Sequence, residues 1–176
     1  TFSDNYCNNS GTTVIFINGI FTSQDSAKAD KNLLEDNFRK IAKRNDIIFN
    51  NGYNPSHLSG FGDIFKVITQ AYMGGSVDYD LTTILNQVHS ELSTQKVLLV
   101  GHSQGTFYTN ATYDYLIGHG VPKESISVYN IATPADRVAG NGNWLTCSSD
   151  KLINNVVREL TGLGLAKRPL SANIDI

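Results

Sequence analysis

The residues that could carry chemistry stand together in one short segment, Gly101-His-Ser-Gln-Gly105. A serine with glycine two positions before and after it is typical of a nucleophile held on a sharp turn between a buried strand and a helix. Its hydroxyl becomes nucleophilic when a neighbouring base takes its proton. Glycine and serine each make up about 7% of residues, so the pattern arises by chance in about 6% of chains of this size. Its meaning therefore depends on the elements around it.

The segments on both sides of the motif have the required character. Lys96–Val100 is a continuous apolar run that is typical of a buried strand, and a helix is predicted from about Ser103 onward. A side chain at Gly101 or Gly105 would collide where the strand and the helix converge. Ser103 is therefore the predicted nucleophile, and a tight turn without catalysis is the alternative. The predicted helix carries apolar residues four positions apart: Phe107, Ala111 and Tyr115.

Short apolar strands alternate with amphipathic helices along the rest of the chain. Strands that are apolar throughout need cover on both faces, which the crossover helices of a parallel sheet provide. The sequence therefore predicts one α/β domain over residues 1–176, with a mostly parallel sheet and helices on both faces. The further predicted strands are Thr12–Asn18, Asp46–Asn50, Ile126–Ile131 and Asn143–Cys147, and the further helices are 26–44, Asp78–Ser93 and Lys151–Leu160.

From about Thr12 to its C-terminus the chain resembles the α/β-hydrolase superfamily, within it the lipase and esterase-like members, whose nucleophile turns often read Gly-His-Ser-x-Gly. The resemblance implies hydrolysis of carboxylic esters through an acyl-enzyme on Ser103, with a small acyl ester or a lipid as substrate. It also implies a lid over the acyl pocket within residues 53–79, which are rich in glycine and apolar residues. A helix packed on the sheet is the simpler interpretation of that segment.

The resemblance further implies an oxyanion hole made of backbone N–H groups. One comes from Gln104, directly after the nucleophile, and the other from Ile20 or Phe21, just after an earlier strand. Many members of the superfamily have His-Gly where this chain has Asn18-Gly19. That difference leaves the backbone donors in place.

The triad of the superfamily follows the chain order serine, acid, histidine. Asp150 follows the strand two after the nucleophile strand and is the first choice for the acid. Asp136, after the intervening strand, is the alternative acid. Asp136 could instead pair with Arg137, and Asp150 could be the N-cap of the helix that follows it.

No histidine follows Asp150 in the sequence. Because the chain stops where the last strand is expected, the domain is interpreted as lacking its last strand and helix, and with them the catalytic histidine. His57 follows an earlier strand at the same sheet edge as Ser103 and is the alternative base. A second hypothesis is a catalytically inactive, hydrolase-like binding or interaction domain. The remaining histidines are placed less well for the role of base: His89, His102 and His119.

Composition limits the other classes of function. With 14 Lys and Arg against 16 Asp and Glu in 176 residues, the chain lacks the cationic field that nucleic-acid binding needs. No apolar run approaches the roughly 18 residues of a membrane span. Cys7 and Cys147 fit no metal motif, and Gly162-x-Gly164 fits no nucleotide motif, so neither metal nor cofactor is predicted. The absent initiator Met and a Cys7–Cys147 disulfide would favour a secreted or periplasmic location; two unpaired thiols are the equal alternative. The oligomeric state is not indicated.

Overall fold

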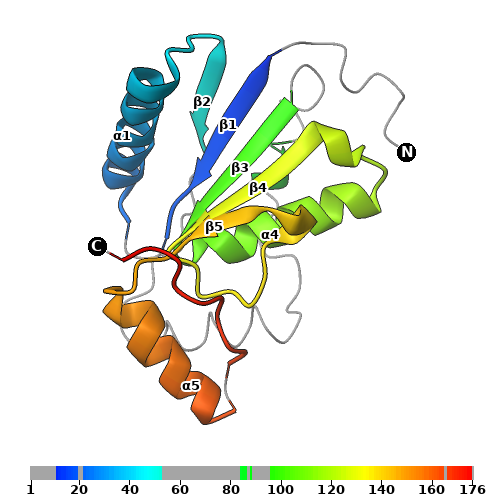
Figure 1. The fold of residues 1–176 in the computed structure, drawn as a ribbon. Helices are drawn as coiled ribbons and strands as arrows, with labels where there is room; N and C mark the ends of the chain where they lie inside the picture. Colours follow the sequence, from blue (N-terminus) through cyan, green and yellow to red (C-terminus); the bar gives the residue numbers. More distant parts are fainter. Residues whose placement is uncertain are drawn as a thin grey trace.

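A computed structural model describes residues 11–19, 22–52, 84–86, 88, 96–164 and 166–175. They form an open sheet of five strands in the order β2-β1-β3-β4-β5, and all neighbouring strands are parallel (Figure 1). The predicted α/β fold class is confirmed. The strands are β1 (Thr12–Ile17), β2 (Ile47–Asn51), β3 (Lys96–His102), β4 (Ile126–Ile131) and β5 (Asn143–Leu145). The labelled α-helices are α1 (Gln24–Ala42), α4 (Gly105–Gly118) and α5 (Arg158–Gly162).

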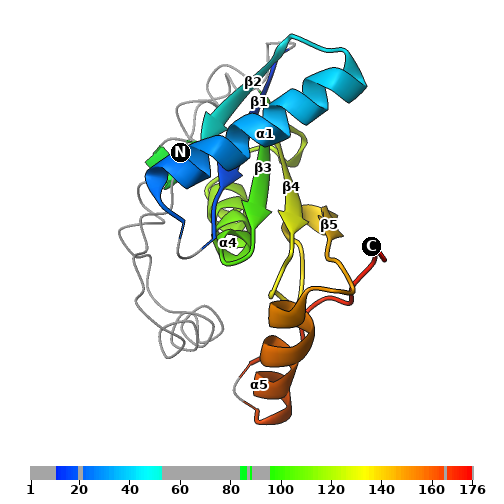
Figure 2. The same ribbon diagram turned by 90° about the vertical axis from the view of Figure 1, so that its left-hand side faces the viewer.

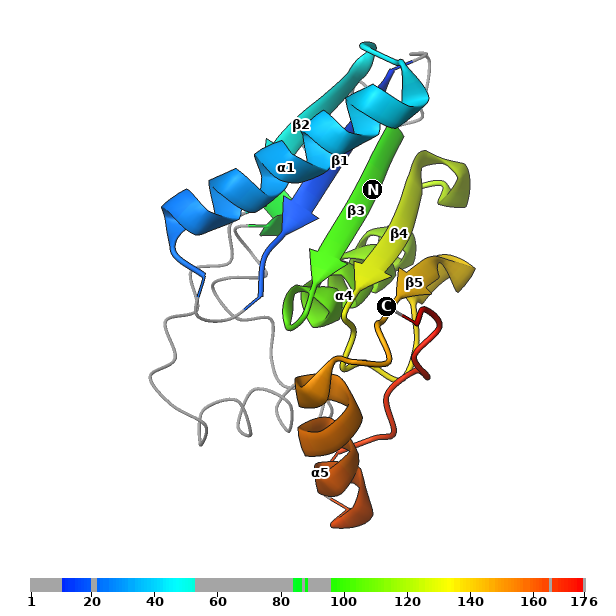
Figure 3. The ribbon, with the colours of Figure 1, turned by 60° about the vertical axis from the view of Figure 1, so that its left-hand side comes forward.

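Helices α1 and α4 cover opposite faces of the sheet (Figures 2 and 3). The chain passes from β1 through α1 to β2 at one edge, and from β3 through α4 to β4 on the other side. Connections between parallel strands are right-handed, so crossovers that run in opposite directions place their helices on opposite faces.

Alternate residues of the central strands build a separate core on each face. One core packs β1 and β3 against α4, and it also contains Ile84, Leu85 and Val88. Residues 84–86 and 88 are helical, and the rest of the helix predicted for Asp78–Ser93 lies outside the described residues. The other core packs the remaining face of β1, with β2, against Leu34 and Phe38 of α1.

The face that α4 buries is not the one that carries the apolar residues four positions apart, Phe107, Ala111 and Tyr115. Tyr115 is 38% exposed, and Phe107 and Ala111 are only half-buried. The helix instead buries a face rich in threonine, because these hydroxyls find polar partners: Thr109 donates to Asn130 of β4, and Thr106 accepts from Thr133 in the connection after β4. The buried residues include Thr106, Thr109, Thr112, Tyr113 and Leu116.

Helix α1 begins two residues earlier than predicted and ends two residues earlier. It begins at Gln24 because the Ser23 side chain is the N-cap and accepts the Ser26 N–H over 3.1 Å. It ends at Ala42 because Lys43 adopts a left-handed conformation with φ of 51°.

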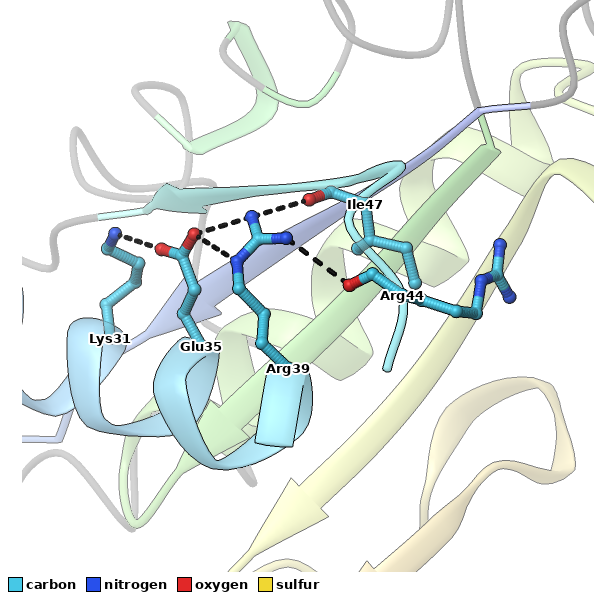
Figure 4. A network of polar contacts seen from close by, with 5 residues as sticks. All are labelled: Lys31, Glu35, Arg39, Arg44 and Ile47. Atoms are coloured by element: carbon cyan, nitrogen blue, oxygen red, sulfur yellow. Dashed lines mark hydrogen bonds and ion pairs between the residues drawn. The ribbon is translucent and has the colours of Figure 1, made fainter. Parts of the chain in front are cut away.

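Arg39 links α1 to β2 (Figure 4). Its guanidinium donates to Glu35 Oε1 over 2.7 and 3.0 Å and to the Ile47 carbonyl over 3.1 Å. The centre of the guanidinium also lies 5.7 Å from the centroid of the Phe49 ring, within range of a cation–π interaction. Hydrogen bonds from Lys31 and then from Arg39 lower the pKa of Glu35. The ion pairs of Glu35 with Lys31 and Arg39 therefore remain charged at neutral pH.

The last described residues return to the end of β5. The Asn173 side chain donates to the Trp144 carbonyl over 2.7 Å and accepts the Thr146 N–H over 2.9 Å. A parallel bridge joins Cys147 to Ile174. This bridge is the extent of strand pairing that the described residues show at the place where the last strand is expected. Cys7 lies outside the described residues, so its pairing with Cys147 stays a prediction.

After Cys147 the chain is helical from Lys151 to Gly162, as predicted for Lys151–Leu160. A π-helical stretch, Leu152–Val157, continues into α5. Ile153 and Val157 pack against Phe107 in the first turns of α4. The segment lies at the end of the sheet to which the strands point (Figure 3).

Candidate active site

Ser103 lies in the turn that connects β3 to α4. Its φ is 53°, in the left-handed region that residues other than glycine adopt rarely. Its N–H donates to the Ile131 carbonyl of β4 over 2.9 Å. Its carbonyl accepts both the N–H and the hydroxyl of Thr106, over 3.1 and 2.7 Å. Neighbouring elements therefore hold both polar backbone groups of this strained residue.

Three glycines allow the backbone to pack tightly around Ser103. A Cβ at Gly105 would lie 2.2 Å from the Ile17 carbonyl oxygen, and one at Gly101 would lie 2.8 Å from a Cα in the first turn of α4. A Cβ at Gly19 would lie 2.9 Å from the Cβ of Ser103 and 3.4 Å from its Oγ. The structure thus gives Gly101 and Gly105 the steric role that the sequence predicts, and places Gly19 beside the serine.

The carboxyl ends of β1 and β3 are the place where the connections of the sheet diverge. These strands are neighbours, yet one continues to β2 and the other to β4 on the opposite side. Open parallel sheets bind ligands in the crevice outside such a switch point. Asn18 and Gly19 follow β1 here, and Ser103 follows β3. The serine is therefore at the position where this class of sheet binds small molecules.

Gln104 connects Ser103 to α4. It is buried, its backbone is helical, and its carbonyl accepts the Phe107 N–H over 3.0 Å. N–H groups at the start of a helix, together with the helix dipole, favour negative charge. This is the environment that the predicted oxyanion donor requires. The other predicted donors, Ile20 and Phe21, lie outside the described residues.

Asp150 is the N-cap of the helical segment after β5. Its Oδ1 accepts the Ile153 N–H over 3.0 Å, and its carbonyl accepts the Asn154 N–H over 2.9 Å. The N-cap interpretation is therefore confirmed. The same carboxylate also acts on the candidate site, because its negative charge favours the protonated form of His102, next to Ser103.

Asp136, the alternative acid, lies in the connection between β4 and β5. Its carboxylate forms an ion pair with Lys167 over 3.3 Å, and Arg137 pairs with Asp114 of α4. The alternative interpretation of Asp136, an ion pair with Arg137, is wrong, because these two adjacent side chains pair with Lys167 and Asp114 respectively.

Two of the four histidines lie in described parts of the chain. His102 ends β3; burial lowers its pKa, and the charges of Asp30 and Asp150 oppose that shift. His119 follows the far end of α4, where its Nδ1 lies 2.6 Å from the carbonyl oxygen of the residue four positions earlier. The intact helix separates it from Ser103. The others lie outside the described residues: His57 and His89.

A buried polar network joins α4 to β4 and to the connection after it. The Thr109 hydroxyl donates to Asn130 Oδ1 over 2.7 Å, and the Thr133 hydroxyl donates to Thr106 Oγ1 over 3.1 Å. These contacts were not predicted from the sequence. Threonines at positions 106, 109 and 112, three apart in a predicted helix, were the available signal.

No protein-family model matches the chain, and no curated protein matches it. Among solved structures, the chain is similar to a histone deacetylase from Saccharomyces cerevisiae, with 14% sequence identity and a TM-score of 0.37. The similarity covers 88% of this chain and 77% of that chain, and is too low to support a functional argument. In the described residues, His, Cys, Asp and Glu side chains form no cluster of three that could hold a metal ion. The same part of the chain contains no helix with the length and hydropathy of a membrane span.

Proposed function

We propose that this protein is a serine hydrolase that cleaves carboxylic esters through an acyl-enzyme on Ser103. The observation that carries the proposal is the left-handed backbone of Ser103 in a strand-to-helix turn at the switch point of the sheet. Strained residues of this kind cluster at functional sites, because the surrounding structure must hold them in place. The close approach of Gly19 also brings the backbone after β1 to the serine side chain.

In the proposed reaction the Oγ of Ser103 attacks the carbonyl carbon of the ester while a base takes the hydroxyl proton. The carbonyl oxygen becomes an oxyanion, which the Gln104 N–H and the backbone after β1 stabilise. The tetrahedral intermediate then expels the alcohol, which receives the proton from the base, and Ser103 is left acylated. Water attacks the acyl carbon by the same route, releases the carboxylic acid and restores the serine.

Asp150 is the acid of the proposed triad, and His57 is the alternative base, which can be tested directly. The negative charges of Asp30 and then of Asp150 favour the protonated form of His102, adjacent to the nucleophile, whereas Asp136 pairs with Lys167. A triad carboxylate orients a histidine and stabilises its protonated form. His57→Ala should therefore lower kcat for ester hydrolysis, and an unchanged kcat would exclude His57 as the base.

A fluorophosphonate probe tests the proposal, because it forms a covalent bond with an activated serine. We expect stoichiometric labelling of the protein and none of Ser103→Ala. Ser127→Ala, which alters an exposed serine of β4, is the control and should be labelled fully. Hydrolysis of p-nitrophenyl esters of graded acyl length should fall by about a thousandfold or more in kcat in Ser103→Ala, and the graded series measures the acyl preference.

A folded protein that does not react with the probe would contradict the proposal. It would favour the second candidate, an inactive hydrolase-like binding or interaction domain. Labelling that persists in Ser103→Ala would place the reactive group elsewhere in the chain.

A further inference from the structure

A line of buried hydrogen bonds reaches the carbonyl of Ser103 from the connection between β4 and β5. The Ala135 N–H donates to the Thr133 hydroxyl over 3.1 Å. The Thr133 hydroxyl donates to Thr106 Oγ1, also over 3.1 Å. The Thr106 hydroxyl donates to the Ser103 carbonyl over 2.7 Å. Thr106 and Thr133 are both 0% exposed, so water does not compete for the bond between their hydroxyls.

The direction of this line is fixed by its donors. Each hydroxyl has a single hydrogen to give, so the Thr133 hydrogen points to Thr106 and the Thr106 hydrogen points to Ser103. Successive bonds in a low-dielectric interior polarise and strengthen one another. A threonine in a helix often bonds the carbonyl three residues earlier. Here the hydroxyl of Thr106 also accepts a bond from a second element, which sets its orientation.

We infer that Thr106 and Thr133 are positioning residues for the nucleophile, an inference that rests on the proposed function of Ser103. The Ile131 carbonyl holds the Ser103 N–H, and Thr106 holds the Ser103 carbonyl. These two anchors fix a backbone conformation that a serine does not otherwise favour. They thereby direct its Oγ to the carboxyl edge of the sheet. Loss of the Thr106 hydroxyl leaves the carbonyl with the Thr106 N–H and allows the turn to relax.

Thr106→Val tests the inference, because valine keeps the shape of threonine and removes the hydroxyl. In the folded protein we expect about a tenfold lower rate constant for fluorophosphonate labelling and about a tenfold lower kcat for p-nitrophenyl butyrate. KM should stay within about twofold, because nucleophile position affects the chemical step rather than substrate binding. Thr106→Ser keeps the hydroxyl and should retain at least about half of the kcat.

A matched control and a second variant complete the experiment. Thr112 is buried in the same helix, and its hydroxyl has no hydrogen-bond partner in the described structure, so Thr112→Val should leave both constants unchanged. Thr133→Val removes the hydroxyl that donates to Thr106. It should lower kcat by about threefold, because the Thr106–Ser103 bond remains but is no longer strengthened by the bond from Thr133. It tests the inference independently of how well Thr106→Val folds. Circular dichroism establishes the folded fraction of each variant.

The outcomes separate the inference from the function on which it rests. Normal rates in both Thr106→Val and Thr133→Val would overturn the inference and leave the proposed function intact. An equal loss in Thr112→Val, or no rescue by Thr106→Ser, would also overturn it, because the loss would then come from general packing. A folded wild type that is neither labelled nor active contradicts the proposed function, and the inference fails with it.

Discussion

The backbone of Ser103 is held in a conformation that costs an L-residue about 1–2 kcal/mol. Contacts from two elements hold it: the Ile131 carbonyl of β4 and the N–H and hydroxyl of Thr106 in α4. Gly19 leaves room beside the side chain. A strained polar residue at the carboxyl edge of a parallel sheet supports the proposed role of Ser103.

Replacement of Asp150 by asparagine separates its two roles. Asparagine caps a helix about as well as aspartate, so Asp150→Asn should change the free energy of unfolding by less than about 0.5 kcal/mol. It removes the charge proposed to stabilise a protonated histidine, so kcat for p-nitrophenyl esters should fall by about a thousandfold or more. Urea unfolding and steady-state kinetics measure the two effects. Asp136→Asn is the matched control, and a larger loss of kcat there would assign the acid role to Asp136.

His102 should make the stability depend on pH. Burial lowers its pKa in the folded protein, below the value of about 6.5 expected in the unfolded chain. Between these two pKa values the unfolded state binds the proton and the folded state does not. The free energy of unfolding should therefore fall as the pH decreases below about 6.5, and level off below the folded pKa. Urea titrations from pH 7.5 to 5 should show a shallower decline in His102→Gln. Equal declines in both proteins would refute this assignment.

Residues whose roles depend on local geometry were predictable from the sequence. Gly101 and Gly105 were predicted from steric demand in a strand-to-helix turn, and the N-cap role of Asp150 from its place before a helix. The partner of Arg137 was not predictable, because Asp114 is distant in the sequence and is brought near by the packing of α4. The same holds for Thr133, which meets Thr106 across two elements.

At the scale of elements, apolar periodicity predicted where strands and helices lie better than where they end. The end of β3 extends past the apolar run to His102, because pairing with β4 continues to Ile131. The start of α1 is set by the Ser23 side chain and its end by the left-handed Lys43. Such ends depend on single hydrogen bonds and dihedral angles, which periodicity does not report.

The attachment of α1 to β2 should depend on Arg39. Arg39→Leu keeps an apolar stem over Phe49 but removes the bonds to Glu35 and to the Ile47 carbonyl. We expect a loss of about 1–2 kcal/mol in the free energy of unfolding, at the low end because the Arg39 side chain is 30% exposed. Lys40→Ala, at an exposed neighbouring position, is the control and should change stability by less than about 0.5 kcal/mol. Urea unfolding that gives equal values for the two variants would contradict the role of Arg39.

At the scale of the whole molecule, the order β2-β1-β3-β4-β5 brings two distant parts of the sequence to one place. Asn18 and Ser103 are about half of the chain length apart in the sequence, yet they follow neighbouring strands. A parallel sheet was predictable from uniformly apolar strands, but the order was not, because strand neighbours are chosen by long-range packing. The order locates the switch point of the sheet, where sheets of this class bind ligands, without naming any chemistry. The proposed chemistry depends on Ser103 and the groups around it.

The hydrogen bonds of Asn173 close residues 147–172 into a loop, because they join the two ends of this segment. The chain leaves the sheet after Thr146 and comes back to the same residue. These hydrogen bonds do not involve the helix inside the loop. Leu163, 71% exposed, lies in the turn at the tip, where a protease could cut the chain while both halves stayed docked. The helix that packs on Phe107 thus lies within a loop whose two ends are joined without it.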